Sequence, residues 1–191
     1  TAGFSIMDRE RLISKIRETL GKDYKSVPVY LLHGDLTSAQ MNGLYEHPKV
    51  KAMINFTKGE GFGRPLLEFS LTGKPVIVSN WSGHLDFLPS EFAGLVGGTL
   101  QQVHPSAHVP NVILADSQWF KPDDNQVGHA FNDVFDKYKD YQEKAKRLAF
   151  RNKQNFSLDK MTEALNKTLI KYVPEFPKHI ELKLPKLTKI K

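Results

Sequence analysis

Short runs of apolar residues, each about the length of a buried strand, recur through the first half of the chain. They are rich in residues that favour β-structure, and segments with helical spacing separate them. The predicted strands are residues 27–32, 52–56 and 75–79, with a shorter one near 94–96. Strands that alternate with helices at this spacing indicate an α/β fold, in which helices cover both faces of a parallel sheet.

The helices are predicted from apolar positions three and four residues apart and from residues that favour helix ends. Ser5 and Gly21 suit the start and the end of the first helix, and Pro65 suits the first turn of another. The predicted helices are residues 5–20, 37–45, 64–71, 124–138, 139–153 and one that follows Ser157. The region 97–122 contains three prolines and is expected to be irregular. The predicted helices that follow it form a helical C-terminal extension.

Composition narrows the range of functions. The 191 residues suit one domain, and 40% hydrophobic with 25% charged residues is ordinary for a globular protein. The chain has no cysteine, which excludes disulfides, thiolate nucleophiles and cysteine-based zinc sites within it. It contains no apolar run of about 20 residues and no leader-like start, so we expect a cytoplasmic protein without a transmembrane segment.

The net charge of +6 is concentrated near the end of the chain. Residues 178–191 contain five lysines and one glutamate, and the charges elsewhere are too balanced to predict a nucleic-acid-binding surface. Prolines interrupt residues 174–191, so no long helix is expected there. This basic tail could be an edge strand, an arm that docks on a partner, or a solvated segment.

The segment of residues 57–68 connects a predicted strand to a predicted helix and is rich in glycine. Ligands of open α/β sheets bind beyond the carboxyl ends of the strands, and glycines let a ligand approach the backbone closely. Free N–H groups at a helix start favour a phosphate or another anion. Glu60 and Glu68 lie eight residues apart, which is about 12 Å along a helix axis. The segment therefore suits a ligand with hydroxyls at both ends and phosphate between them, although a turn with solvated glutamates remains an alternative.

The same residues resemble a known family motif. Glu60-Gly61-Phe62-Gly63, with Pro65 and Glu68, is similar to the E-x7-E motif of retaining glycosyltransferases of the GT-B fold, group 1. The similarity continues through the Gly73-Lys74-Pro75 turn and residues 76–80 to Gly83, and upstream through Gly34 to Tyr45. It implies a Rossmann-like sheet that forms the C-terminal, nucleotide-sugar-binding half of such an enzyme.

The resemblance implies a role for each matching residue. Glu60 would bind hydroxyls of the transferred sugar as the catalytic residue, and Glu68 would bind the ribose. The backbone N–H groups of Gly61, Phe62 and Gly63 would meet the sugar and the distal phosphate. The remaining donor-site candidates are Gly34 and Leu36 beside the base, His84 beside the sugar, and Lys58 and Arg64 at the phosphates, although both of these could instead be surface residues.

The resemblance also implies an activity and its requirements. The expected reaction transfers a hexosyl group from a nucleotide diphosphate sugar with retention of configuration, without a cofactor. No Asp-x-Asp motif occurs, and His104 and His108 are separated by a proline, so no metal site is expected. Residues 1–173 would form the donor domain without its first strand–helix unit. An N-terminal acceptor domain or a partner chain would complete it, and the isolated chain is expected to be incomplete for catalysis.

Two other functions fit the same residues. One is a non-catalytic structural or binding subunit that keeps the donor-domain fold. The other is a different GT-B enzyme, such as a sugar-nucleotide epimerase. The sequence does not identify the sugar, the base, the acceptor or the oligomeric state.

Overall fold

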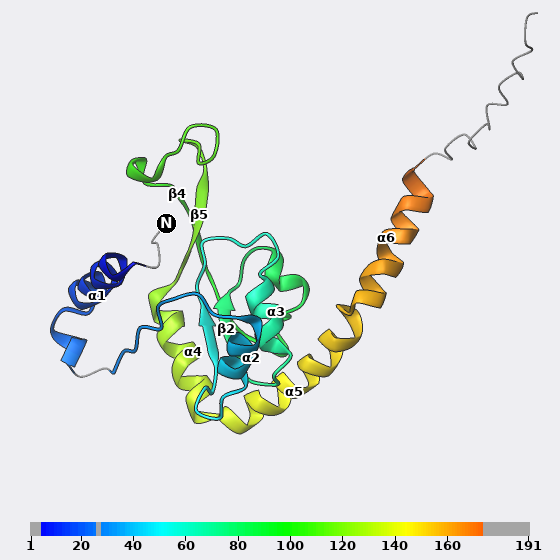
Figure 1. Cartoon of the computed structure of the whole chain (residues 1–191), viewed down its shortest axis with the longest axis horizontal. Coiled ribbons are helices and arrows are strands. Elements are labelled where there is room, and N and C mark those ends of the chain that lie inside the picture. The colour runs from blue at the N-terminus through cyan, green and yellow to red at the C-terminus, as the bar shows by residue number, and fades with distance from the viewer. Residues whose placement is uncertain (1–4, 26–27, 174–191) are drawn as a thin grey trace, which may run out of the picture. The chain divides into compact units, whose positions relative to one another are not determined.

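Residues 5–25 and 28–173 are described by a computed structural model, in which the chain divides into two units (Figure 1). The first unit is Thr1–Met53 and the second is Ile54–Lys191. All of the segment from Glu60 to Glu68 belongs to the second unit, which also contains most of the sheet. The assignment of residues 1–173 to one donor domain stays a prediction.

The first unit contains two of the predicted helices. Helix α1 (Ile6–Leu20) begins after Ser5, whose side chain accepts a hydrogen bond from the Asp8 N–H, and ends at Gly21, which has a positive φ of 54°. Helix α2 (Ser38–Glu46) begins after Thr37, which forms a reciprocal capping box with Gln40. Both predicted helices are confirmed. The sequence could predict them because the signals that define their ends are local.

The strand predicted at residues 27–32 is wrong as far as the structure describes it. Residue 27 lies outside the described residues, and residues 28–32 have no regular secondary structure. Tyr30 is 91% exposed and Leu32 is 62% exposed. A strand needs a hydrogen-bonded neighbour, and among the described residues none pairs with this run. An apolar, β-favouring composition does not reveal whether a neighbour exists.

A three-stranded sheet forms the centre of the second unit. Strands β1 (Met53–Asn55), β2 (Val76–Ser79) and β3 (Gly94–Val96) lie in that order, and β2 pairs with β3 in parallel. Every residue of β2 is buried, as expected for a central strand that is covered on both faces. The predicted α/β fold with a parallel sheet is therefore confirmed.

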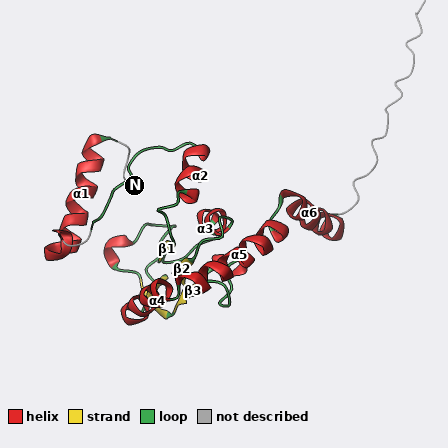
Figure 2. Cartoon of the chain, turned by 90° about the horizontal axis from the view of Figure 1, so that it is seen from below, coloured by secondary structure: helices red, strands yellow, loops and turns green. Residues whose placement is uncertain are grey.

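The described part of the second unit also contains four α-helices. Helix α3 (Arg64–Ser70) follows β1, and helices α4 (Asp124–Asp136), α5 (Tyr138–Asn155) and α6 (Leu158–Tyr172) come after the strands. Helix α4 contacts β3, and α5 contacts both α3 and α4, an arrangement that Figure 2 shows from below. Helix α6 contains no buried residue, and the basic tail of residues 174–191 lies outside the described residues. Within the described part of the chain, no helix is long and apolar enough to cross a bilayer.

The expectation of an irregular region at residues 97–122 is wrong at both ends of that region, although residues 103–117 contain no strand or α-helix. Strands β4 (Gly98–Gln102) and β5 (Gln118–Pro122) form an antiparallel hairpin, which rises from the end of the sheet where β3 finishes (Figure 1). Its register pairs Leu100 with Phe120 and Gln101 with Trp119. The prolines misled the prediction, because they lie in the connecting segment or at the last strand position, where no inner ladder hydrogen bond is lost.

A buried asparagine connects helix α5 to the elements beneath the site. Asn152 is 1% exposed, and its amide donates hydrogen bonds to the Ser70 hydroxyl (2.9 Å) and to the Phe87 carbonyl (3.2 Å). The Ser70 hydroxyl in turn donates to the Leu67 carbonyl, 2.7 Å away. These bonds join α5, α3 and the segment after β2, so they fix the helix that carries Glu68.

We predict that Asn152→Ala lowers the free energy of unfolding by about 1–3 kcal/mol, because it leaves buried polar groups without a partner. Urea denaturation followed by circular dichroism measures this change. Asn155→Ala, at the exposed end of the same helix, is the matched control and should change stability by less than about 0.5 kcal/mol. Equal effects of the two substitutions would contradict the assignment.

Candidate functional site

The glycine-rich loop (residues 59–63) is held by hydrogen bonds from the segment that follows β2. The Ser82 hydroxyl accepts a hydrogen bond from the Glu60 N–H (2.8 Å) and donates one to the Glu60 carbonyl (2.5 Å). The Gly83 N–H donates to the same carbonyl at 3.1 Å. Three hydrogen bonds therefore fix the main chain of Glu60, at the carboxyl end of the sheet where an α/β fold binds its ligands.

Gly83 and Gly63 allow the glycine-rich loop to lie close to the segment that follows β2. A Cβ atom on Gly83 would lie only 2.0 Å from the Gly61 carbonyl oxygen, so no larger residue fits without moving the backbone. Gly63 has a φ of 82° and precedes the first residue of α3. A Cβ there would be strained and would also lie 3.2 Å from the His84 Cβ. The loop geometry therefore requires glycine at both positions.

An aromatic cluster holds the side chain of Phe62. Its ring centroid lies 5.1 Å from that of Phe87 and 6.1 Å from that of Phe156, and Phe87 and Phe156 are 5.8 Å apart. Phe87 is completely buried, whereas the Phe62 ring is 40% exposed. The cluster is an anchor for the loop, and sequence analysis missed it, because only the fold brings Phe156 close to Phe62.

His84 lies beneath the loop. It is completely buried, and its Nε2 is 2.8 Å from the Ser79 carbonyl oxygen, to which it donates if that nitrogen carries the proton. Its Nδ1 has no hydrogen-bond partner among the described residues. The predicted contact between His84 and a sugar stays a prediction. In the structure, His84 supports Gly63 from within the core.

The glycine-rich loop contains backbone hydrogen-bond donors without an acceptor among the described residues. The backbone N–H groups of Gly61, Phe62 and Gly63 have no acceptor within the described part of the chain. The N–H groups of Leu66 and Leu67 both donate to the Gly63 carbonyl, so the free donors precede the helix. Successive free backbone donors in a glycine-rich turn suit the oxygens of an anion such as phosphate.

The two predicted carboxylates have different surroundings. Glu60 is partly exposed, and no described side chain forms an ion pair or hydrogen bond with its carboxylate. Glu68 lies on α3, with its Oε1 3.2 Å from the Arg64 Nε. The Arg64 side chain is 81% exposed, and an exposed pair of this kind contributes at most about 1 kcal/mol. A ligand can therefore displace or join this ion pair at little cost.

Lys58 is directed to the hairpin. Its ammonium lies 3.6 Å from the centroid of the Trp119 ring, and its carbonyl accepts a hydrogen bond of 3.2 Å from the Phe120 N–H. The hairpin is thus attached to the residue just before the glycine-rich loop. Gly34 and Leu36 belong to the first unit, and their predicted contact with a base stays a prediction.

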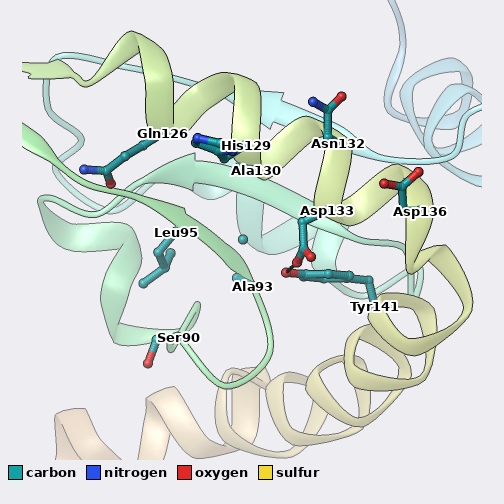
Figure 3. A pocket seen from close by; sticks show the side chains of 11 residues that line it. Ser90, Ala93, Leu95, Gln126, His129, Ala130, Asn132, Asp133, Asp136 and Tyr141 are labelled. Carbon is teal, nitrogen blue, oxygen red and sulfur yellow. Dashed lines mark hydrogen bonds between the residues drawn. The ribbon is translucent and has the colours of Figure 1, made fainter.

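A large groove lies outside the glycine-rich loop. It has a volume of about 650 Å³ and lies between α4 and the start of β3, and none of the predicted site residues lines it. Figure 3 shows the Asp133 carboxylate and the Tyr141 hydroxyl meeting in this groove, 2.6 Å apart. Hydrogen bonds from Lys137 and Tyr141 lower the pKa of Asp133, and the bond to Asp133, with partial burial, raises the pKa of Tyr141 to about 12. The Asp133 carboxylate and the Tyr141 hydroxyl therefore satisfy each other.

Metal-ligating side chains do not gather in the described part of the chain. Within residues 5–25 and 28–173, no group of three or more histidine, aspartate or glutamate residues could hold a metal ion. His104 and His108 have separate partners, since His104 Nδ1 contacts the Ser106 hydroxyl and His108 Nε2 lies 3.3 Å from the Val103 carbonyl.

Comparison with solved structures supports the fold. The chain is similar to a crystal structure of a glycosyltransferase from Rickettsia africae ESF-5, with a TM-score of 0.53 and 18% sequence identity. The match covers 87% of this chain and 38% of the Rickettsia chain, so this chain spans well under half of that protein. No protein-family model matches the sequence, and no curated protein matches it either. The α/β unit described above is therefore a fold that also occurs as part of a glycosyltransferase.

We predict that Gly83→Ala lowers the free energy of unfolding by about 2 kcal/mol or more, because the added methyl group overlaps the Gly61 carbonyl. Urea denaturation measures the loss. Gly128→Ala is the control, because a Cβ at this position of α4 meets nothing within 4 Å and should stabilise the helix by up to about 1 kcal/mol. A Gly83→Ala protein as stable as the original chain would show that the observed contact between the two loops is absent in solution.

Proposed function

We propose that the chain binds a nucleotide diphosphate sugar at the glycine-rich loop and is the donor-binding part of a retaining GT-B glycosyltransferase. The observation that carries the proposal is the fixed loop itself. Free backbone donors lie between two carboxylates at the ligand-binding edge of an α/β sheet. The similarity of the fold to part of a glycosyltransferase supports the same conclusion, as does the resemblance of residues 60–68 to the E-x7-E motif.

Each part of the ligand has a matching group. The Glu60 carboxylate has no partner among the described side chains, so it can accept hydrogen bonds from two sugar hydroxyls. Glu68 can accept from the two ribose hydroxyls, and Arg64 beside it can donate to the diphosphate. Lys58 contacts Trp119 instead, so Arg64 is the better candidate for the phosphates.

The proposed chemistry uses the loop in two ways. The N–H groups of Gly61, Phe62 and Gly63 would stabilise the negative charge that develops on the departing diphosphate, without a metal ion. Glu60 would hold the hexosyl group in position while the bond between its anomeric carbon and the diphosphate breaks. Because three hydrogen bonds fix the Glu60 main chain in advance, little reorganisation is needed when the donor binds. Most of the acceptor site would come from a further domain or a partner chain.

The two glutamates give the first test of these roles. Calorimetric titration with UDP-, GDP- and ADP-sugars should identify one that binds. Glu68→Ala should lower the affinity for that nucleotide sugar and for its free nucleotide alike, by about tenfold. The reason is that the substitution removes hydrogen bonds to a charged acceptor. Glu60→Ala should lower only the affinity for the nucleotide sugar. Glu18→Ala, which removes a carboxylate from α1, is the control and should change neither affinity.

Other outcomes separate the alternatives. Equal losses for both ligands from both substitutions would contradict the assigned roles. Failure of every nucleotide sugar to bind the intact chain would favour a structural subunit that keeps the fold. If a complete assembly converts the bound sugar to its epimer without transferring it, the epimerase is the correct reading.

A further inference from the structure

A second groove lies beside the glycine-rich loop, along the β4–β5 hairpin. It has a volume of about 310 Å³, and aromatic rings, amides and basic groups line it. Among the described residues that line it, none is acidic. This hairpin groove includes Lys58, Gln101, His104, Trp119 and Lys121.

The register of the hairpin explains which side chains share its face. Successive residues of a strand point to opposite faces, so Trp119 and Lys121 lie on the same face of β5. Gln101 pairs with Trp119 across the hairpin and lies on that face too. Phe120 lies on the other face, where the Trp81 ring stacks on it with centroids 6.0 Å apart and an interplanar angle of 4°. Trp119, Lys121 and Gln101 therefore share the face of the hairpin that lines the groove, so an aromatic ring lies there beside basic and amide groups.

Two ammonium groups in the groove lack a compensating carboxylate. Neither Lys58 nor Lys121 forms an ion pair with an acidic residue in the described part of the chain. The contact with the Trp119 ring restricts the Lys58 ammonium without neutralising its charge, so its N–H groups can still donate to an anion. A restricted cation loses less entropy on binding than a freely rotating one.

We propose that the hairpin groove binds a negatively charged sugar, either a sugar phosphate or a uronate, on the acceptor side of the site. The lysines would bind the anionic group, Trp119 would contact the sugar ring, and the amides would bind hydroxyls. Lys58, which lines the groove, lies two residues before Glu60 in the sequence, and the Phe120 N–H joins the hairpin to the Lys58 carbonyl at 3.2 Å. The acceptor assignment rests on the proposed function, whereas anion binding by the groove does not.

The two tryptophans of the chain provide a direct readout. Their indole N–H groups give two signals in a ¹H–¹⁵N NMR spectrum, and Trp81→Phe and Trp119→Phe assign them. Glucose 6-phosphate, glucuronate, glucose and inorganic phosphate are each titrated into the intact chain. We expect a saturable shift of the Trp119 signal with glucose 6-phosphate or glucuronate, and a much weaker response to glucose and to phosphate alone. The charged sugar that binds with the higher affinity identifies the preferred anionic group.

Lys121→Gln tests the role of charge, because it keeps a polar side chain of similar length. It should lower the affinity for the charged sugar about tenfold, which is the loss expected when one charge-assisted hydrogen bond is removed. Lys139→Gln, an exposed lysine on α5, is the matched control and should leave the affinity unchanged. The Trp81 signal reports whether each variant keeps its fold.

Three results would overturn the proposal: an unchanged Trp119 signal, an equal response to neutral glucose, or an unaltered affinity in Lys121→Gln. Titration of the same variants with the nucleotide sugar separates the two assignments. If the groove binds charged sugars but no nucleotide sugar binds the loop, the donor assignment fails and the anion site stands. If Lys121→Gln lowers the affinity for the nucleotide sugar itself about tenfold, the groove is part of the donor-binding site. The assignment of the groove to the acceptor is then wrong.

Discussion

The site depends on the hydrogen bonds between the Glu60 main chain and the segment after β2. Ser82 both donates to and accepts from Glu60, and the Gly83 N–H donates to the same carbonyl. These bonds join the two segments that follow the adjacent strands β1 and β2 at their carboxyl ends. They use only the N–H and carbonyl groups of Glu60 and leave the N–H groups of Gly61, Phe62 and Gly63 without an acceptor in the described part of the chain.

The surroundings of the loop combine a rigid base with an adaptable surface. Beneath it, Phe87 and His84 are completely buried, and Asn152 connects α5 to α3. Above it, Glu60 has no described partner, and the Arg64–Glu68 pair is exposed and weak. Fixed main-chain donors with free side-chain acceptors are the arrangement that a binding site needs if the protein is to hold a charged, hydroxyl-rich ligand without reorganising.

The sequence was informative wherever local signals decide the structure. Helix ends at Ser5 and Thr37 and the buried run of β2 were correctly predicted, since capping and continuous apolarity act over a few residues. The β4–β5 hairpin was missed, because its strands are weakly apolar and their pairing spans residues 98 to 122. Residues 28–32 have a strand-like composition without a described partner strand. In the candidate site, the carboxylates and glycines were proposed from their spacing, whereas the cluster of Phe62 with Phe156 and the bonds from Ser82 depend on residues distant in the sequence.

The central claim is that the free N–H groups of the glycine-rich loop bind the diphosphate of a nucleotide sugar. The most direct measurement is the backbone ¹H–¹⁵N NMR spectrum of the chain during titration with UDP-, GDP- and ADP-sugars. The account predicts that one of them shifts the Gly61, Phe62 and Gly63 amide signals to saturation, with smaller shifts for Leu66 and Leu67, which already donate to Gly63. Saturable binding that leaves the signals of Gly61 to Gly63 unchanged would contradict it.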